Sequence, residues 1–194
     1  MYDFFAFINR MKYIERWGLM RNIVSDNLQE HCFQTAMLAH ALCFIDCKYF
    51  GGKLVPERAA IYALYHDSAE IITGDMPSPV KYYNSSIRGT YREIEENAQN
   101  QIIGMLPEDF REEYGRIINY ENEDAQYIPI VKAADKLTAY LKCVEEERCG
   151  NVDFSSARKS LGKIIADMNM PCVNYFMEHF AGSYDKPLDE LGRN

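Results

Sequence analysis

Apolar residues recur along most of this chain at the three- and four-residue spacing that is typical of amphipathic α-helices. The clearest example starts at Pro56, because proline suits the first turn of a helix. Its apolar positions continue through residues 59–64, and Thr73-Gly74 ends the helix. The strict alternation of apolar and polar residues that marks a half-buried strand is absent from the sequence. The pattern therefore predicts helices as the main elements.

Further helices are predicted along the rest of the chain, separated by short turns. They are expected from Phe4 to Ile14, from an N-cap at Ser25 or Asp26 to Gly51-Gly52, from about Ser86 to Met105, from Pro107 to about Tyr120, from Ala125 to about Arg148, after an N-cap at Asp153, and after Pro171. No linker rich in proline, glycine or serine and no internal repeat divides the sequence. We therefore expect an all-α fold, a helical bundle that residues 1–194 form as a single domain.

The charge of the chain narrows the class of ligand. The formal net charge is −8, and no basic stripe runs along the sequence. This argues against a nucleic-acid polymer as partner, because such a ligand requires many phosphates to be neutralised. A small anion is still allowed, with Arg16, Arg21 and Lys81 as the candidate cations.

The cysteines and the longest uncharged stretch indicate the compartment. The six cysteines include no Cys-x-x-Cys pair, and no secretory signal is recognisable, so we expect reduced and mostly buried thiols. The longest uncharged stretch, Cys32 to Ile45, is too short to cross a bilayer. We therefore expect a soluble, cytoplasmic protein with no membrane partner.

Four side chains on three of the predicted helices form a candidate metal site. His66 and Asp67 are adjacent on the helix that starts at Pro56, His31 lies on the preceding helix, and Asp135 follows two alanines on a later one. Two imidazoles with two carboxylates suit a first-row divalent ion such as Mn, Fe, Co, Ni or Zn, and leave room for water and substrate. Magnesium more usually takes oxygen ligands alone. We predict one such transition-metal cation.

Glu70 is the candidate proton carrier beside this site. On a continuous helix it lies one turn beyond His66 and three residues beyond Asp67, so all three side chains could converge. It could instead accept a hydrogen bond from a ligand imidazole. Both interpretations remain open from the sequence.

Several other polar and aromatic residues have simple structural interpretations. By itself Asp75 could be a turn former, Arg16 a surface charge and Trp17 a packing anchor. His40 and His179 are expected to be structural, and the run Glu145-Glu146-Glu147 to be a solvated face. The remaining aromatic residues exceed what one small core needs and suggest a dimer surface, the prominent ones being Tyr82, Tyr83, Tyr127, Tyr140, Tyr175 and Phe176.

In this order, the metal-site residues resemble the pattern of the HD-domain metal-dependent phosphohydrolases. Further segments narrow the resemblance to the bacterial 5′-deoxynucleotidase family of the YfbR type, and it extends over nearly the whole chain. These segments are Arg16-Trp17-Gly-Leu-Met-Arg21-Asn22, Asn27-Leu-Gln-Glu30-His31, Tyr65-His66-Asp67-Ser-Ala-Glu70, 73–82 and Lys132-Ala-Ala-Asp135. The resemblance implies an all-α, homodimeric HD domain with a C-terminal helical extension, acting on deoxyribonucleoside 5′-monophosphates.

Position by position, the resemblance also implies roles for individual residues. The metal ligands would be His31, His66, Asp67 and Asp135, and the acidic catalytic residues Glu70 and Asp75. The substrate contacts would be Arg16, Trp17, His31, Asp67, Asp75, Met76, Pro77, Ser78 and Asp135. Met76 and Ser78 replace the Leu and Thr common in the family, and Ser68-Ala69 replaces its Ala-Ser order.

These roles suggest a reaction scheme. The cation would act as a Lewis acid and activate a water, which Glu70 would orient or deprotonate while Asp75 protonates the leaving 5′-oxygen. Arg16 would bind the phosphate with two hydrogen bonds, and Trp17 would leave no room for a 2′-hydroxyl, whatever the base.

Two other functions stay open from the sequence alone. One is a different HD phosphohydrolase that acts on cyclic nucleotides or alarmones. The other is a noncatalytic nucleotide-binding HD module, against which the presence of Glu70 and Asp75 argues.

Overall fold

The computed structural model describes residues 1–81 and 83–192, and helices are its main regular elements. Its α-helices are α1 (Phe4–Ile8), α2 (Leu28–Ile45), α3 (Pro56–Tyr65), α4 (Glu70–Thr73), α5 (Ser78–Lys81), α6 (Ser85–Gly104), α7 (Glu108–Ile118), α8 (Tyr120–Glu123), α9 (Ile128–Arg148), α10 (Ser155–Asp167) and α11 (Pro171–His179). Short 3₁₀ segments are Asn9–Tyr13, Ala125–Tyr127, Val152–Phe154, Ala181–Asp185 and Leu188–Glu190, and a π turn spans Asp46–Phe50. Within the described ranges no β-strand forms, which confirms the predicted all-α fold.

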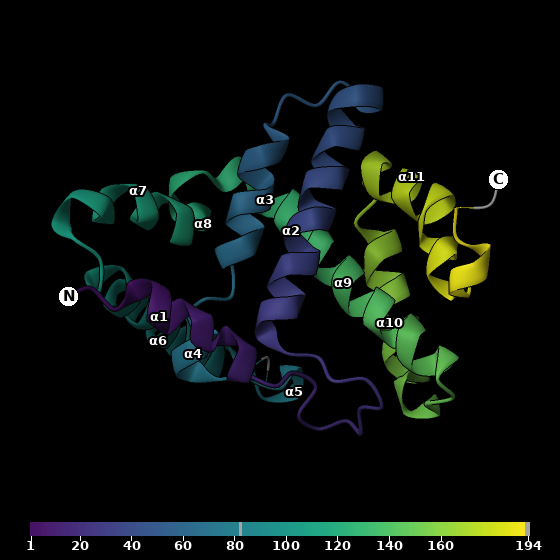
Figure 1. Cartoon of the computed structure of the whole chain (residues 1–194), viewed down its shortest axis with the longest axis horizontal. Coiled ribbons are helices and arrows are strands. Elements are labelled where there is room, and N and C mark those ends of the chain that lie inside the picture. The colour runs from purple at the N-terminus through teal and green to yellow at the C-terminus, as the bar shows by residue number, and fades with distance from the viewer. Residues whose placement is uncertain (82, 193–194) are drawn as a thin grey trace.

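Helix α2 is the centre of the bundle, and it packs most extensively against α3 and α9 (Figure 1). The N-terminal helix, α6 and α7 lie on one side of it, while α10 and α11 lie on the other. Small residues such as Ala39 and Ala63 are fully buried where α2 and α3 meet, so these two helices approach closely. The main apolar core comprises mainly residues of α2, α3, α9 and α11, including Leu42, Leu137 and Val173.

Helix α2 begins later than the sequence predicted. Ser25 and Asp26 were the expected caps, but the side chain of Asn27 caps α2 by accepting a hydrogen bond from the amide of Glu30 at 3.1 Å. The Asp26 carboxylate is used elsewhere, since it accepts a hydrogen bond from the indole of Trp17. The π turn Asp46–Phe50 continues α2 up to the predicted end, where Gly51 has a left-handed conformation.

The helix that starts at Pro56 is shorter than predicted. Helix α3 ends at Tyr65, a tight turn covers residues 66–69, and α4 starts at Glu70 and ends at Thr73, with Gly74 as its C-cap. Within the turn the amide of Ser68 donates to the carbonyl of Tyr65 at 3.0 Å. The continuous helix predicted over these residues was therefore wrong.

Two other predicted boundaries also differ. Residues 4–14 form α1 followed by a 3₁₀ segment rather than one helix. Asp153 does not cap α10, because it lies within the 3₁₀ turn Val152–Phe154, where the side chain of Asn151 accepts a hydrogen bond from the amide of Asp153 at 3.3 Å. Among the described residues, no helix combines the length and apolar character needed to cross a membrane.

Candidate metal centre and active site

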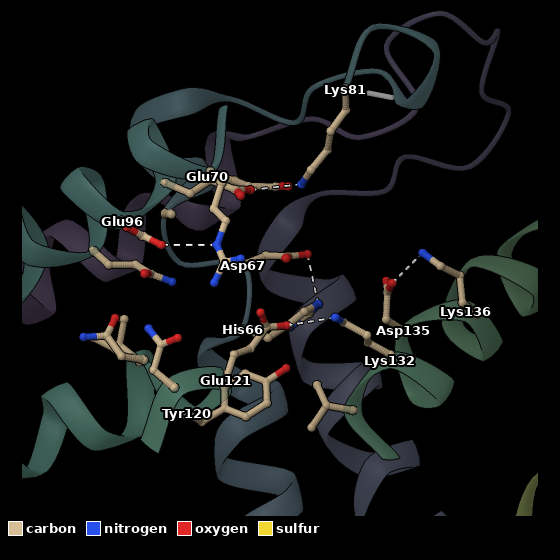
Figure 2. A pocket seen from close by; sticks show the side chains of 18 of the residues that line it. His66, Asp67, Glu70, Lys81, Glu96, Tyr120, Glu121, Lys132, Asp135 and Lys136 are labelled. Atoms are coloured by element: carbon tan, nitrogen blue, oxygen red, sulfur yellow. Dashed lines mark hydrogen bonds and ion pairs between the residues drawn. The ribbon is translucent and has the colours of Figure 1, made fainter. Parts of the chain in front are cut away.

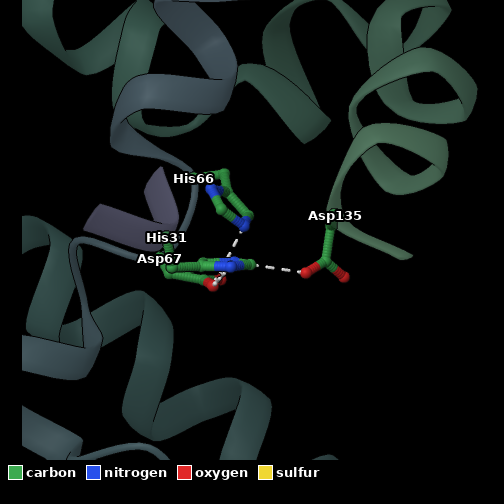
Figure 3. Close-up of side chains that lie close together, drawn as sticks. All are labelled: His31, His66, Asp67 and Asp135. Carbon is green, nitrogen blue, oxygen red and sulfur yellow. Dashed lines mark ion pairs between the residues drawn. The ribbon is translucent and has the colours of Figure 1, made fainter. Parts of the chain in front are cut away.

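The four predicted metal ligands come together from three places in the fold (Figure 3). His31 lies in the first turns of α2, His66 and Asp67 follow the last residue of α3, and Asp135 lies in the middle of α9. One ligand atom from each side chain lies within 4.8 Å of the ligand atoms of the others. Segments far apart in sequence therefore present two imidazoles and two carboxylates to one point.

His66 and Asp67 are neighbours in the turn after α3, and their side chains approach each other. His66 keeps helical backbone angles at the C-terminal end of α3, with φ −57° and ψ −36°. Its Nε2 atom lies 2.9 Å from Oδ2 of Asp67. The turn therefore presents both side chains to the same point.

The distances among the ligand atoms fit one small cation. His31 Nε2 lies 3.6 Å from Oδ2 of Asp67 and 3.3 Å from Oδ1 of Asp135. Two ligands bound at about 2.1 Å from an ion lie at most about 4.2 Å apart, so these pairs are close enough to share it.

The two imidazoles present Nε2 atoms that are buried and lack hydrogen-bond partners. The ring of His66 is oriented by its other nitrogen, since Nδ1 lies 2.7 Å from the carbonyl oxygen of Ala63 and donates to it in the tautomer that leaves Nε2 as a ligand. A buried nitrogen without a partner is costly. The geometry and the donor types therefore both fit a divalent metal.

Charges within the cluster keep both carboxylates ionised. Burial alone would raise the pKa of Asp67, but His66 and His31 outweigh it and hold that pKa well below its usual range. Burial also raises the pKa of Asp135, but the nearby His31 and the charge of Lys136 outweigh it and lower that pKa. Carboxylates in this state are competent metal ligands.

Glu70 is buried beside the ligands, with 6 % of its surface exposed. Burial, reinforced by the charges of Asp67 and Asp75, raises its pKa to about 9. One of its oxygens, Oε2, is buried without a hydrogen-bond partner. A cation on the four ligands would act in the opposite direction, because nearby positive charge favours the carboxylate. Glu70 is therefore a titratable group that can hold or release a proton next to the cluster.

Arg16 connects the cluster to Asp75. Its Nη1 atom lies 3.9 Å from Oδ2 of Asp67 and 4.0 Å from Oδ1 of Asp75. Burial lowers the pKa of Arg16, but the surrounding carboxylates together outweigh it and raise the pKa, so the side chain stays charged; they are Asp67, Asp26, Asp135 and Asp75. A permanent cation thus lies within reach of anything bound to the ligands. Arg21, another candidate cation, is exposed and lies 3.9 Å from Asp153 instead.

Trp17 has an uncommon backbone conformation, with a φ of 58°. Left-handed backbone is rare for bulky residues and costs about 1–3 kcal/mol, so the surroundings must hold it. The indole Nε1 donates to Oδ2 of Asp26 at 2.9 Å, and the ring packs on Phe154 with centroids 5.2 Å apart. Arg16 also donates to Oδ2 of Asp26, at 3.4 Å. One aspartate therefore fixes both side chains.

A polar pocket of about 400 Å³ opens from the metal-ligand cluster toward α6 and α8 (Figure 2). His66, Asp67, Glu70 and Asp135 line one end. The rest of its wall carries charged and amide side chains, among them Lys81, Arg92, Glu95, Gln99, Asn119, Asn122, Lys132 and Lys136. A pocket of this size can hold a nucleotide-sized ligand.

The remaining predicted substrate contacts lie outside the wall of this pocket. The pocket is not lined by Arg16, Trp17, His31, Asp75, Met76, Pro77 or Ser78. Met76 and Pro77 are half-buried, and Ser78 is exposed at the start of α5. Their roles in substrate binding stay predictions.

Sequence reasoning missed a buried polar cluster on α9. The run 145–147 was interpreted as a solvated face, yet Glu146 is 0 % exposed and bonds to Lys142 and Asn151. That interpretation was wrong at its central residue. The helical spacing of Lys142 and Glu146 could have suggested a pair, but nothing local to the run indicated burial.

The histidines, aromatic residues and cysteines outside the cluster mostly have the structural positions that the sequence predicted. His40 is exposed on α2, and His179 is exposed with its ring 4.2 Å from that of Tyr175. The aromatic excess is partly core, because Tyr127 and Phe176 are buried. Tyr83 is 76 % exposed, and Tyr140 and Tyr175 are half-buried. Tyr82 lies outside the described residues. All six cysteines are free thiols and most are buried.

Solved structures with this fold define a class of protein. An HD-domain phosphohydrolase from Listeria innocua superposes with a TM-score of 0.79 at 21% identity, covering 94% of this chain and 88% of the other. A cyanophage S-2L HD phosphohydrolase, bound to dA and one catalytic Zn²⁺ ion, superposes with a TM-score of 0.69 at 18% identity, covering 94% and 96%. The fold is that of the HD-domain phosphohydrolases.

Sequence relatives specify the family within this class. A 5′-deoxynucleotidase from Vibrio vulnificus is 45% identical over 188 residues, 97% of each chain. A 5′-deoxynucleotidase from Shewanella oneidensis is 44% identical over 193 residues, 100% of this chain and 99% of the other. The model of the family described as 5′-deoxynucleotidase YfbR-like matches residues 3–184. The chain belongs to this family.

Proposed function

We propose that this protein is a metal-dependent phosphoric monoester hydrolase, a 5′-deoxynucleotidase that converts deoxyribonucleoside 5′-monophosphates to deoxyribonucleosides and phosphate. The observation that carries the proposal is the cluster of His31, His66, Asp67 and Asp135 within 4.8 Å, in a chain of the YfbR-like family. The relatives' activity supports the choice of substrate. The adjoining pocket supports a small ligand.

These four residues would hold one divalent cation, drawn from Co, Mn, Zn, Fe or Ni. When bound, such a cation supplies Lewis acidity at a phosphate oxygen and lowers the pKa of a coordinated water. Imidazole with carboxylate is the donor set that this group of ions accepts.

Glu70 and Asp75 would share the proton transfers. Glu70 is buried at the start of α4, three residues after Asp67, where it can take a proton from the attacking water. Asp75 lies 4.0 Å from Arg16, so its carboxyl group is close to the phosphate that Arg16 would bind, and it can supply a proton to the leaving 5′-oxygen. Exchanged roles for the two groups are equally consistent with their positions.

Arg16 and Trp17 would hold the substrate. Arg16 is oriented by Asp26 and directed at Asp67, and its planar head can give two parallel hydrogen bonds to a phosphate. Trp17 would pack against the sugar and leave no space for a 2′-hydroxyl. Asp75, Met76, Pro77 and Ser78 would complete the substrate contacts. The base would be free to vary.

A panel of substrates and metals tests the proposal directly. Phosphate release is measured from deoxyribonucleoside and ribonucleoside monophosphates, each with Co, Mn, Zn, Ni and Mg. We expect turnover of several deoxyribonucleotides, much slower turnover of ribonucleotides, and weak support by Mg. Turnover of cyclic nucleotides or alarmones instead would identify a different HD phosphohydrolase. Tight nucleotide binding with no turnover under any metal would identify a noncatalytic module.

We also propose that residues 1–194 act as one HD domain, with the C-terminal helices as an extension, in the cytoplasm and as a homodimer. An exposed apolar stripe on α2 supports self-association, because Phe33, Met37 and Phe44 are 59 %, 51 % and 54 % exposed. Their spacing places them on one side of the helix. Light scattering on Met37→Glu tests this, and Ile164→Glu, at an exposed large apolar residue of α10 outside the stripe, is the matched control. Dimers that persist in Met37→Glu would exclude the α2 stripe.

A further inference from the structure

A buried ion pair lies about two to three turns beyond Asp135 on α9, and the proposed reaction makes no use of it. Lys142 and Glu146 are 7 % and 0 % exposed, and Nζ of Lys142 lies 2.6 Å from Oε1 of Glu146. Asn151, 2 % exposed, donates from Nδ2 to Oε2 of Glu146 at 2.7 Å. Charges are costly to bury, so such a cluster needs partners that satisfy it.

Those partners are main-chain atoms of the loop at residues 15–27, the segment that carries Arg16 and Trp17. Glu146 accepts from the amide of Ile23 at 3.0 Å and from that of Val24 at 3.0 Å. Lys142 donates to the carbonyl of Val24. Asn151 donates to the carbonyl of Arg21 at 2.7 Å. The cluster therefore holds the distal part of the 15–27 loop to α9.

The two ends of the same loop, at residues 15–16 and 26–27, are joined by backbone hydrogen bonds. Glu15 and Asn27 form an isolated antiparallel bridge, and the amide of Arg16 donates to the carbonyl of Asp26 at 2.9 Å. Residues 15–27 contain no helix of their own. With its two ends joined and its distal part held by Glu146, the loop has two fixed points, and Trp17 lies between them.

The cluster also reaches the indole through Phe154. Phe154 is fully buried three residues after Asn151, with its ring centroid 5.2 Å from that of Trp17 and 5.8 Å from Nζ of Lys142. The turn that supplies Asn151 thus also supplies the surface on which Trp17 packs. A left-handed tryptophan persists only where its surroundings determine its place, and these contacts provide that constraint.

We propose that Glu146, with Lys142 and Asn151, is a positioning group that fixes the 15–27 loop and thereby sets the discrimination between deoxyribose and ribose. The proposal rests on the proposed function, because Trp17 is taken as the wall beside the sugar. Glu146 does not touch the substrate. It acts by holding that wall in place.

Glu146→Gln tests the proposal, because the amide retains one acceptor and leaves Lys142 buried without a counter-charge. Asn151→Ala is a milder second variant that removes both hydrogen bonds from Nδ2 without leaving an unpaired charge. Glu145→Gln is the matched control, since it removes the same charge from an exposed neighbour on α9. Thermal unfolding followed by circular dichroism establishes that each variant is folded.

Two readouts are compared in the metal-loaded enzyme. Trp17 is the only tryptophan, so acrylamide quenching of fluorescence reports directly on the exposure of its ring. The second readout is the ratio of kcat/KM for dAMP to kcat/KM for AMP. In Glu146→Gln we expect stronger quenching and a fall in this ratio of about tenfold, since small displacements of a positioned group have effects of at least this size. Asn151→Ala should shift both in the same direction by less, and Glu145→Gln should shift neither.

An unchanged value of either readout in folded Glu146→Gln overturns the proposal. If that variant does not fold, the same criterion applies to Asn151→Ala. Failure of the proposed function has a different signature, namely wild-type protein that releases no phosphate from dAMP with any metal. In that case quenching still decides whether the cluster positions Trp17.

Discussion

The metal-ligand cluster and the 15–27 loop meet where Arg16 approaches Asp67, but they are built in different ways. The cluster is held by regular elements, with His31 on α2, Asp135 on α9 and the pair at 66–67 in a tight turn directly after α3. The loop has no helix and depends on side chains from distant parts of the chain. In the proposed function, residues of the packed core would thus carry the reaction chemistry, and a separately held segment would carry substrate discrimination.

A second contrast concerns charge. At the cluster, two imidazoles and two carboxylates lie within 4.8 Å of one another, close enough for one cation to bridge them. The imidazoles lower the pKa of Asp67 and so favour its charged form. At the loop, Lys142 and Glu146 neutralise each other, and their other hydrogen bonds join main-chain atoms of the loop and the side chain of Asn151. The first set can bind an added ion, while the second is internally satisfied. Mutations at the cluster should therefore affect metal content and turnover, whereas mutations at the loop should affect the preference for dAMP over AMP.

The largest expected effect comes from removing a ligand. His66→Ala or Asp67→Ala should lower kcat/KM for dAMP by more than about 100-fold, because even partners outside the coordination sphere cost 10–100-fold. Bound metal, measured by mass spectrometry of the purified protein, should fall in parallel. His40→Ala, an exposed histidine on α2, is the control and should keep both. A near wild-type rate with stoichiometric metal in His66→Ala would contradict the proposed centre.

A smaller effect is expected at the wall of the sugar site. Trp17→Ala should reduce the preference for dAMP over AMP by about tenfold or more, because excluding one small group is worth about 1–3 kcal/mol. Metal content should not change, which separates this variant from the ligand variants. Separate measurements of kcat/KM for the two nucleotides provide the test. An unchanged preference would place the wall at another residue.

The smallest effect is expected from lowering the pH, through protonation of Glu146. Burial raises the pKa of Glu146, but hydrogen bonds from Lys142, Asn151 and the loop amides outweigh it and lower the pKa to about 2. A carboxylate with a lowered folded-state pKa stabilises the fold above its unfolded value of about 4.3, and this contribution is lost as pH falls toward 2. Acrylamide quenching of Trp17 fluorescence should therefore increase as the pH falls from about 4.3 toward 2.

The comparison with Glu146→Gln isolates this group from the other carboxylates. Asp67 and Asp135 also have lowered pKa values and contribute to acid sensitivity in both proteins. The free energy of unfolding should depend less steeply on pH in the variant than in the wild type. Equal slopes from pH 5 to pH 2 would show that Glu146 does not contribute.

The sequence predicted most of the helices from local signals, and it predicted the convergence of His31, His66, Asp67 and Asp135 from their residue types and order along the chain. Pro56 marks the start of α3, and Thr73-Gly74 marks the end of α4. The break after Tyr65 carries no proline or glycine to reveal it. At this break Asp67 lies 3.6 Å from His31 on α2, a long-range contact that helical periodicity does not encode.

The loop was the least predictable part for the same physical reason. Aspartate is a residue type that often caps helices, but the carboxylate of Asp26 accepts hydrogen bonds from Trp17 and Arg16 instead. The side chain of Asn27 caps α2 in its place. Glu146 lies in a run that resembles a solvated face, and its partner Ile23 is 123 residues away in sequence. Propensity and spacing describe what a residue can do locally. They do not show which distant backbone atoms will need a partner.

The acceptor that orients the His66 ring belongs to the main chain, at the carbonyl of Ala63. Every amino acid carries this carbonyl, so a point mutation at position 63 can alter bulk near the imidazole but cannot delete the acceptor. Trp17, in contrast, donates its hydrogen bond to the side chain of one replaceable aspartate, Asp26. In laboratory evolution of this enzyme we would therefore expect sugar preference to drift readily while the orientation of His66 persists.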